Sequence, residues 1–175
     1  MDIDTHLIDT AERLFDREGF NATGMGRLIQ ESGLSSRTVY KHAKSKSALM
    51  ALVLSARQRR FFEHVDFRCT DALFASLTAW VEHEGARGCL FFRLHTETGG
   101  QNPEIEAAVA AYHDRLHAAI ADLVVAETGV VDAELTDQIL ALFEGATTAA
   151  TYRGTAVIEA AGRCARQLIA NGAHL

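Results

Sequence analysis

Positive charge gathers in one short stretch of an otherwise acidic chain. The 175 residues carry a formal net charge of -6. Between Asn21 and Lys46, however, there are five cations and one acid, Glu31. The five cations are Arg27, Arg37, Lys41, Lys44 and Lys46. Clustered cations favour an anionic partner such as a nucleic-acid backbone, although a solvated helix face has the same composition.

The same stretch has the pattern of two short helices joined at Gly33. Glycine tolerates the backbone conformation of a tight turn, and Ser35 is suited to cap the helix that follows. This is the arrangement of a helix-turn-helix, whose second helix enters the major groove. We expect Ser35 to cap the second helix and its first turn, Ser36, Arg37 and Thr38, to face base edges.

Other residues of the stretch are candidates for contacts with the DNA backbone. We expect Tyr40, Lys41 and His42 to lie toward the flanking phosphates. Lys46 stands in the first turn of the next helix, where free amides and the helix dipole favour a phosphate. Thr23 and Gly24 open the preceding helix and are expected to hold a second phosphate in the same way.

These residues resemble a known family. The segment AERLFDREGFNATGMGRLIQESGLSSRTVYKHAKSKSALM, Ala11 to Met50, is similar to the DNA-binding region of the TetR family of bacterial transcriptional regulators. The matches, in order, are LF, Gly19 with an aromatic after it, Ala22-Thr23, SGLS, Thr38, Tyr40, His42 and Ser45-Lys46. The resemblance implies an all-helical homodimer that binds a palindromic DNA operator and is released by a small ligand in its C-terminal domain.

The segment departs from the family pattern at four positions. Gly24 stands where Thr or Ser is usual, so only Thr23 offers a hydroxyl there. Gly26 weakens the same short helix, at roughly 0.8–1 kcal/mol relative to alanine. Ala43 replaces an aromatic residue, and Ser47 replaces an acid.

Composition and periodicity predict an all-α chain of about nine helices. Hydrophobic residues make up 48% of the sequence, and there is one proline. Three helices come first: one that Gly19 is expected to end as a left-handed cap, and two short ones that end at Gly33 and near His42. Caps and apolar stripes predict six more, at about 45–65, 71–84, after Gly88, 103–128, 133–152 and 156–171. We expect a DNA-binding domain at 1–46 and a ligand-binding and dimerisation domain at 47–175.

The sequence also indicates where the chain resides. No apolar run approaches the roughly 20 residues that span a bilayer, and the acidic start lacks the features of a secretory signal. The three cysteines, Cys69, Cys89 and Cys164, are odd in number and far apart. They fit a reducing cytosol better than a disulfide framework, so we expect a cytoplasmic protein.

The last two helices share an apolar face rich in small residues. Small side chains let helices approach closely, so two such helices from each subunit would form a four-helix dimer interface. Packing within one chain is the alternative. The predicted interface consists of Leu135, Ile139, Phe143, Ala146, Ala150, Val157, Ala161, Cys164 and Leu168.

A ligand pocket in the C-terminal domain is implied by the resemblance. Aromatic residues of the middle helices are the expected lining, with His95, Glu97 and Thr147 as polar anchors. For each of these residues, ordinary core packing is the alternative. The predicted lining consists of Phe62, Trp80, Phe91, Phe92, His95, Tyr112, Phe143 and Thr147.

His113 and His117 stand at a spacing that metal ligands use on helices. No cysteine or acid completes a set with convincing spacing, so we expect no metal and no cofactor. Motifs of hydrolases and phosphate loops are absent, and we expect no enzymatic activity. Two further readings stay open: a DNA-binding regulator that responds to a protein partner or to the redox state of Cys89, and a metal-assisted helical enzyme.

Overall fold

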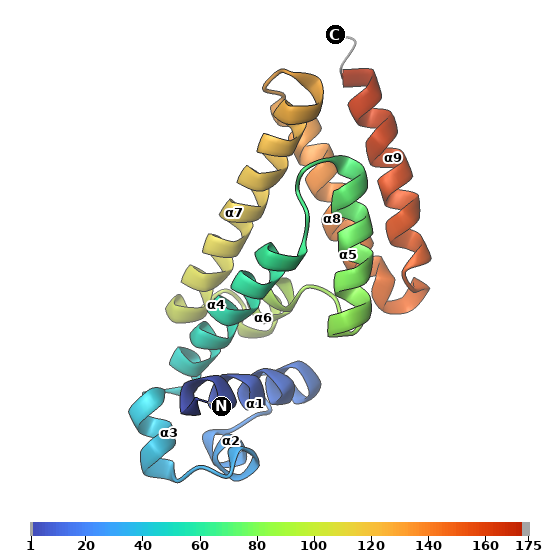
Figure 1. Cartoon of the computed structure of the whole chain (residues 1–175). Coiled ribbons are helices and arrows are strands. Elements are labelled where there is room, and N and C mark those ends of the chain that lie inside the picture. The colour runs from blue at the N-terminus through green and yellow to red at the C-terminus, as the bar shows by residue number, and fades with distance from the viewer. Residues whose placement is uncertain (1, 173–175) are drawn as a thin grey trace. The chain divides into compact units, whose positions relative to one another are not determined.

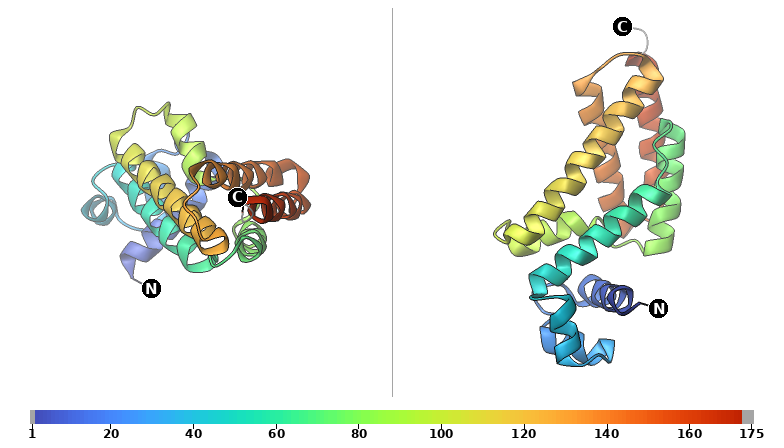
Figure 2. Two further views of the ribbon diagram at one scale, coloured as in Figure 1. Left: turned by 90° about the horizontal axis from the view of Figure 1, so that it is seen from above. Right: turned by 60° about the vertical axis from the view of Figure 1, so that its left-hand side comes forward.

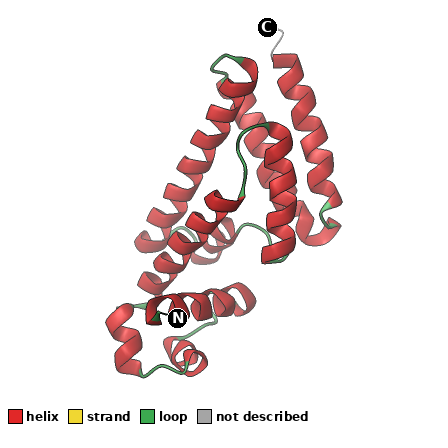
Figure 3. Ribbon diagram, viewed as in Figure 1, coloured by secondary structure: helices red, strands yellow, loops and turns green. Residues whose placement is uncertain are grey.

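The computed structural model describes residues 2–172 and contains helices but no strand within them (Figures 1 and 3). The predicted all-α class is therefore confirmed. The helices of the described range are α1 (Ile3–Glu18), α2 (Met25–Ser32), α3 (Ser36–His42), α4 (Lys46–His64), α5 (Thr70–Glu84), α6 (Leu90–Thr98), α7 (Pro103–Thr128), α8 (Ala133–Arg153) and α9 (Ala156–Gly172). In the described range, each helix is too short or too polar to cross a membrane.

Side chains placed just before the helices fix where they begin. The hydroxyl of Ser45 accepts a hydrogen bond from the Ala48 amide at 2.9 Å, and the Asp132 carboxylate accepts one from the Leu135 amide at 2.9 Å. Asn102 accepts from the Ile105 amide at 3.3 Å, directly before Pro103. Each cap satisfies an amide that has no partner inside its helix, which is why the boundaries were readable from sequence.

Gly19 ends α1 in a different way from the one we expected. Its φ is +87° and its ψ is 158°, which is not the left-handed helical conformation of a common C-cap. The prediction of a left-handed cap at this residue was therefore wrong. The positive φ still favours glycine, and the amide of Gly19 donates to the Phe15 carbonyl at 2.9 Å.

The chain divides into two compact units. Unit 1 comprises Met1–Arg59 and Leu90–Ala111, and unit 2 comprises Arg60–Cys89 and Tyr112–Leu175. The helices α4 and α7 each contribute to both units. A compact unit is not the same thing as a functional domain, so the boundary between residues 46 and 47 stays a prediction.

Unit 1 combines an apolar centre with buried charge. The centre includes the fully buried Leu28, Val39 and Leu49. Beside it, Arg57 donates to the Glu12 carboxylate at 2.9 Å, and both residues are buried. Arg93 of α6 binds Asp16 of α1, at 2.7 Å to the carboxylate and 3.0 Å to the main-chain carbonyl.

Unit 2 is organised around aromatic rings and closely packed helices. The ring of Phe61 lies 5.1–6.3 Å, centroid to centroid, from those of Phe62, Phe67, Trp80, Tyr112 and Phe143. A two-residue turn joins α8 to α9, and Figure 2 shows these two helices side by side. Helix α9 also packs on α5, where a Cβ placed on Gly162 would meet the Phe74 Cβ at 2.9 Å.

Candidate nucleic-acid interface

The turn between α2 and α3 depends on Gly33. This residue has a φ of +66° and a ψ of 8°, the left-handed conformation that other residues rarely adopt. Its amide donates to the Gln30 carbonyl at 3.4 Å, and nothing lies within 4 Å of where a Cβ would stand. Glycine is therefore required by the backbone conformation and not by crowding.

Ser35 then starts α3 as predicted. Its hydroxyl accepts a hydrogen bond from the Thr38 amide at 3.1 Å. The hydroxyls of Ser35 and Thr38 also lie 2.8 Å apart, so the Thr38 side chain takes part in the cap. Thr38 is half-buried there, which makes it a weaker candidate for a base contact than its two neighbours.

One side of α3 faces solvent, and we call its residues Ser36, Arg37, Tyr40 and Lys41 the α3 face. All four are exposed, whereas Val39 and Ala43 on the opposite side are buried. Four of the predicted DNA contacts therefore share one surface of one helix.

The cations of this region differ in their partners. Arg27 is paired with Glu31 at 3.0 Å and lies 3.5 Å from Glu18. Arg37, Lys41 and the exposed Lys44 form no ion pair among the described residues. The charge that remains available is thus concentrated on α3 and just after it.

His42 lies on the side of α3 that faces α1. Its Nδ1 contacts the Asp4 carboxylate, and its side chain is mostly covered. Between α1 and α2, His6 Nε2 lies 2.9 Å from the Ser32 carbonyl. These contacts hold α1 against α2 and α3, and they give His42 a structural role in place of the predicted phosphate contact.

Lys46 also departs from the prediction. Its ammonium donates to the Phe20 carbonyl at 2.8 Å and lies 4.3 Å above the centre of the Phe20 ring. Burial lowers the pKa of Lys46 below its usual value, and the charge of Glu97 partly opposes that shift. A side chain bound in this way is not free to bind phosphate, so Lys46 is a structural residue.

Thr23 and Gly24 differ in accessibility at the start of α2. Thr23 is completely buried, and its hydroxyl donates to the Gly19 carbonyl at 2.7 Å. The structure therefore removes the Thr23 hydroxyl from the predicted phosphate site. Gly24 is exposed as the N-cap of α2, where only the main chain can offer donors.

Glu97 of α6 fixes the turn between α1 and α2, which sequence reasoning missed. Its two carboxylate oxygens accept hydrogen bonds from the amides of Asn21, at 2.7 Å, and Phe20, at 3.1 Å. Its carbonyl accepts a third bond from the Asn21 side chain at 2.9 Å. We had expected Glu97 to anchor a ligand, and the structure assigns it to this turn. No local signal could have revealed contacts between residues so far apart in sequence.

Comparison with known proteins places this site in a family. Residues 7–53 match the family model described as bacterial regulatory proteins, tetR family. UidR of Escherichia coli K12, a helix-turn-helix transcriptional regulator, is 26% identical over 114 residues, which are 62% of this chain and 58% of UidR. Residues 7–53 thus have the sequence pattern of TetR-family regulators.

Solved structures of TetR-family proteins have the same fold. SCO4454 from Streptomyces coelicolor matches over 99% of this chain and 91% of its own, with a TM-score of 0.89 and 21% identity. A regulator from Legionella pneumophila matches over 95% and 97% of the two chains, with a TM-score of 0.77 and 16% identity. The proteins that this chain resembles are described as transcriptional regulators, which supports the expectation of no enzymatic activity.

The dimer residues predicted on α8 are buried inside a single chain. Because they already belong to the core of unit 2, they cannot become buried on dimerisation, and their assignment to the interface was wrong. They are Leu135, Ile139, Phe143, Ala146 and Ala150. The predicted residues on α9 remain accessible: Cys164 is exposed, and Val157, Ala161 and Leu168 are half-buried.

The predicted pocket residues separate into two groups. Phe62, Trp80, Tyr112 and Phe143 come together around Phe61 in unit 2, as described above. Thr147 lies one turn from Phe143 and donates its hydroxyl to the Phe143 carbonyl at 2.9 Å. The others belong to unit 1: Phe91 is buried, Phe92 is 51% exposed, and His95 contacts Glu106 at 2.8 Å.

Proposed function

We propose that this TetR-family chain is a DNA-binding transcriptional regulator that inserts the α3 face into the major groove. The observation that carries this proposal is the α3 face itself. It presents two hydroxyl groups from one short helix behind a glycine turn, together with two cations that pair with no acid in the described part of the chain. Arg37, in the first turn, is suited to the acceptor pair of a guanine, and Lys41 to a phosphate. A regulator that binds chromosomal DNA would act in the cytoplasm.

Selection of bound duplexes from a random library tests this proposal directly. Arg37→Ala is expected to relax the preference at one base pair, at a cost of roughly 1–3 kcal/mol. Lys41→Ala is expected to weaken binding to all sequences and to reduce the salt slope by about one. Arg163→Ala on α9 removes an exposed cation far from α3 in sequence and serves as the control. If Arg37→Ala keeps the sequence preference of the wild type, the proposal that α3 recognises bases is contradicted.

Dimerisation is proposed on the outward sides of α8 and α9. A single groove-reading helix covers few base pairs, whereas two related by symmetry read half-sites about 34–36 Å apart. Small and apolar residues follow one another along these exposed or half-buried sides. They are Ala141, Leu142, Gly145, Ala149, Val157, Ala160, Ala161, Cys164 and Leu168, with Tyr152, which is 74% exposed, at the end of α8.

Introducing a charge tests this interface. Ala160→Arg is expected to give monomers and to abolish the preference for a palindromic duplex, because it would bury an unpaired cation. Ala118→Arg on the exposed side of α7 adds the same group elsewhere and is expected to leave the dimer intact. Analytical ultracentrifugation measures the oligomeric state of both variants. A dimeric Ala160→Arg protein would contradict the proposed surface.

The regulatory input is proposed to be a small apolar or aromatic ligand. It would bind near the aromatic rings that surround Phe61 in unit 2. Helix α4 carries Phe61 and Phe62 near its end and Lys46 in its first turn. A ligand that displaces those rings would shift α4 and thereby alter α3, making operator DNA and ligand compete. Titration of the DNA complex with candidate metabolites tests this step. Failure of every ligand to change DNA affinity would favour a regulator without a small-molecule input.

A further inference from the structure

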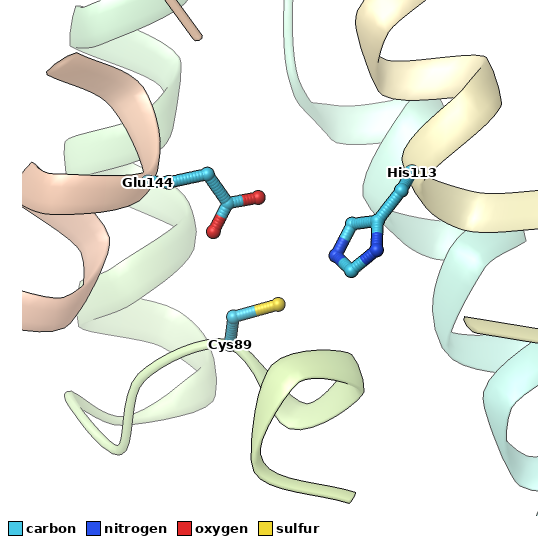
Figure 4. A group of neighbouring side chains, drawn as sticks. All are labelled: Cys89, His113 and Glu144. Atoms are coloured by element: carbon cyan, nitrogen blue, oxygen red, sulfur yellow. The ribbon is translucent and has the colours of Figure 1, made fainter. Parts of the chain in front are cut away.

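Three metal-ligating side chains of unit 2 come together from separate parts of the chain. Cys89 lies just before α6, His113 on α7 and Glu144 on α8. Figure 4 shows the sulfur of Cys89 between the imidazole of His113 and the carboxylate of Glu144. One ligand atom from each residue lies within 4.8 Å of the other two.

From this geometry we propose that Cys89, His113 and Glu144 bind a divalent transition-metal ion of the zinc class. Thiolate, imidazole and carboxylate are the three ligand types that proteins use for Zn²⁺. The soft thiolate and the imidazole disfavour Mg²⁺ and Ca²⁺, which prefer oxygen ligands alone. Three protein ligands leave the fourth tetrahedral position for water or for an anionic group of a small ligand.

The spacing of the three atoms suits such an ion after small side-chain movements. Bonds of about 2.0–2.3 Å at tetrahedral angles place neighbouring ligand atoms roughly 3.3–3.8 Å apart. From separations of up to 4.8 Å, the ligand atoms therefore need to approach one another by about 1.0–1.5 Å at most. All three are half-buried, so an ion would be largely shielded while still exchangeable.

Glu144 independently supports a cation site, because this half-buried acid has no positively charged partner among the described residues. Among the described residues, its carboxylate forms no hydrogen bond or ion pair. A carboxylate in such a place is stabilised by a bound cation, and nothing else near it in the described structure supplies one.

The neighbouring histidine provides an internal contrast. His117 stands one helical turn from His113, but its Nε2 lies 3.4 Å from the Asp137 carboxylate and outside the cluster. The i, i+4 histidine pair that the sequence suggested is therefore not the site. His113 instead combines with residues 24 positions before it and 31 positions after it.

Cobalt titration of the full chain, stripped of metal with a chelator, tests the proposal. We expect one Co²⁺ per chain, with thiolate-to-cobalt charge-transfer absorption, and displacement of Co²⁺ by Zn²⁺. Cys89→Ser is expected to abolish that absorption, and Glu144→Gln and His113→Gln to weaken Zn²⁺ binding by at least about 10–100-fold. Cys69→Ser, Cys164→Ser and His117→Gln are matched controls that should bind as the wild type does.

A second measurement covers the case in which Cys89→Ser does not fold. Bound Zn²⁺ should slow alkylation of Cys89 in the wild-type chain while leaving the alkylation rate of Cys69 unchanged, as mass spectrometry of the labelled peptides would show. Absence of charge transfer, loss of binding in Cys164→Ser, or Cys89 alkylation at the same rate with and without Zn²⁺ would each overturn the site. None of these readouts requires DNA binding, so the site stands or falls separately from the proposed function.

Discussion

The two units are stabilised by different kinds of interaction. In unit 1, charged side chains bind main-chain groups and one another: Glu97 holds the turn at Phe20, and Glu12 pairs with Arg57. In unit 2, aromatic rings surround Phe61, and α9 approaches α5 closely at Gly162. Hydrogen bonds are directional and modest in net free energy, whereas apolar burial is larger and less directional. Directional hydrogen bonds thus define the geometry of unit 1, whereas apolar burial supplies most of the stability of unit 2.

The largest expected effect is loss of the central ring of unit 2. Phe61→Ala should lower the free energy of unfolding by about 3–5 kcal/mol, because it leaves a cavity among five rings. Phe92→Ala, in unit 1, removes a half-exposed ring of the same size and should cost much less. Urea unfolding followed by circular dichroism and by fluorescence of Trp80, the only tryptophan, measures both. Equal losses of unfolding free energy in the two variants would contradict the claim that apolar burial contributes more to the stability of unit 2.

A smaller loss is expected where α5 and α9 meet. Gly162→Ala places a methyl group 2.9 Å from the Phe74 Cβ, which no rotation of the ring relieves. We expect a loss of roughly 1–3 kcal/mol from overpacking. Gly145→Ala on α8 has open space around it and should be neutral or stabilising. If Gly162→Ala is as stable as the wild type, α5 and α9 can move apart without loss of unfolding free energy.

In unit 1, Glu97→Gln tests whether directional hydrogen bonds set the geometry. The amide group would face one of the two main-chain donors that the carboxylate now accepts, at a cost of about 1–2 kcal/mol. The loss of DNA-binding free energy should exceed the loss of unfolding free energy measured by Trp80 fluorescence. Glu63→Gln changes an exposed carboxylate and should alter neither. An effect of Glu97→Gln on Trp80 fluorescence alone would contradict this assignment.

The smallest effect is expected in α2 and has the opposite sign. Gly26 lies within the helix, and nothing would meet its Cβ within 4 Å. Gly26→Ala should therefore stabilise the chain by roughly 0.5–1 kcal/mol, through the lower entropy of the unfolded state. Thermal unfolding measures this gain. Gly33→Ala, where φ is +66°, is the control and should destabilise.

Local sequence signals were sufficient for the helices and for the α3 face. Caps at Ser35, Ser45 and Asp132 involve residues three positions apart, so their patterns are visible in a short window. Exposure of Arg37 and Lys41 follows from the helical period once Val39 is placed inside. These features needed no knowledge of distant contacts.

Contacts between distant residues account for the predictions that failed. Lys46 was interpreted from its place at a helix start, but its partner Phe20 lies 26 positions away. Helix α8 is apolar on more than one side, and periodicity could not tell which side faces the core. The Cys89, His113 and Glu144 cluster joins three elements for the same reason, and no spacing rule would have grouped them.

Unit 1 is discontinuous in sequence, and this has a consequence for synthesis on the ribosome. The bonds from the turn at Phe20 to Glu97 join residues 77 positions apart. Translation adds about 5–20 residues per second, so the first three helices wait for seconds before their partner segment emerges. A chain truncated before α6 would leave those helices without the groups that fix their turn, which makes the nascent N-terminal segment a natural client for chaperones.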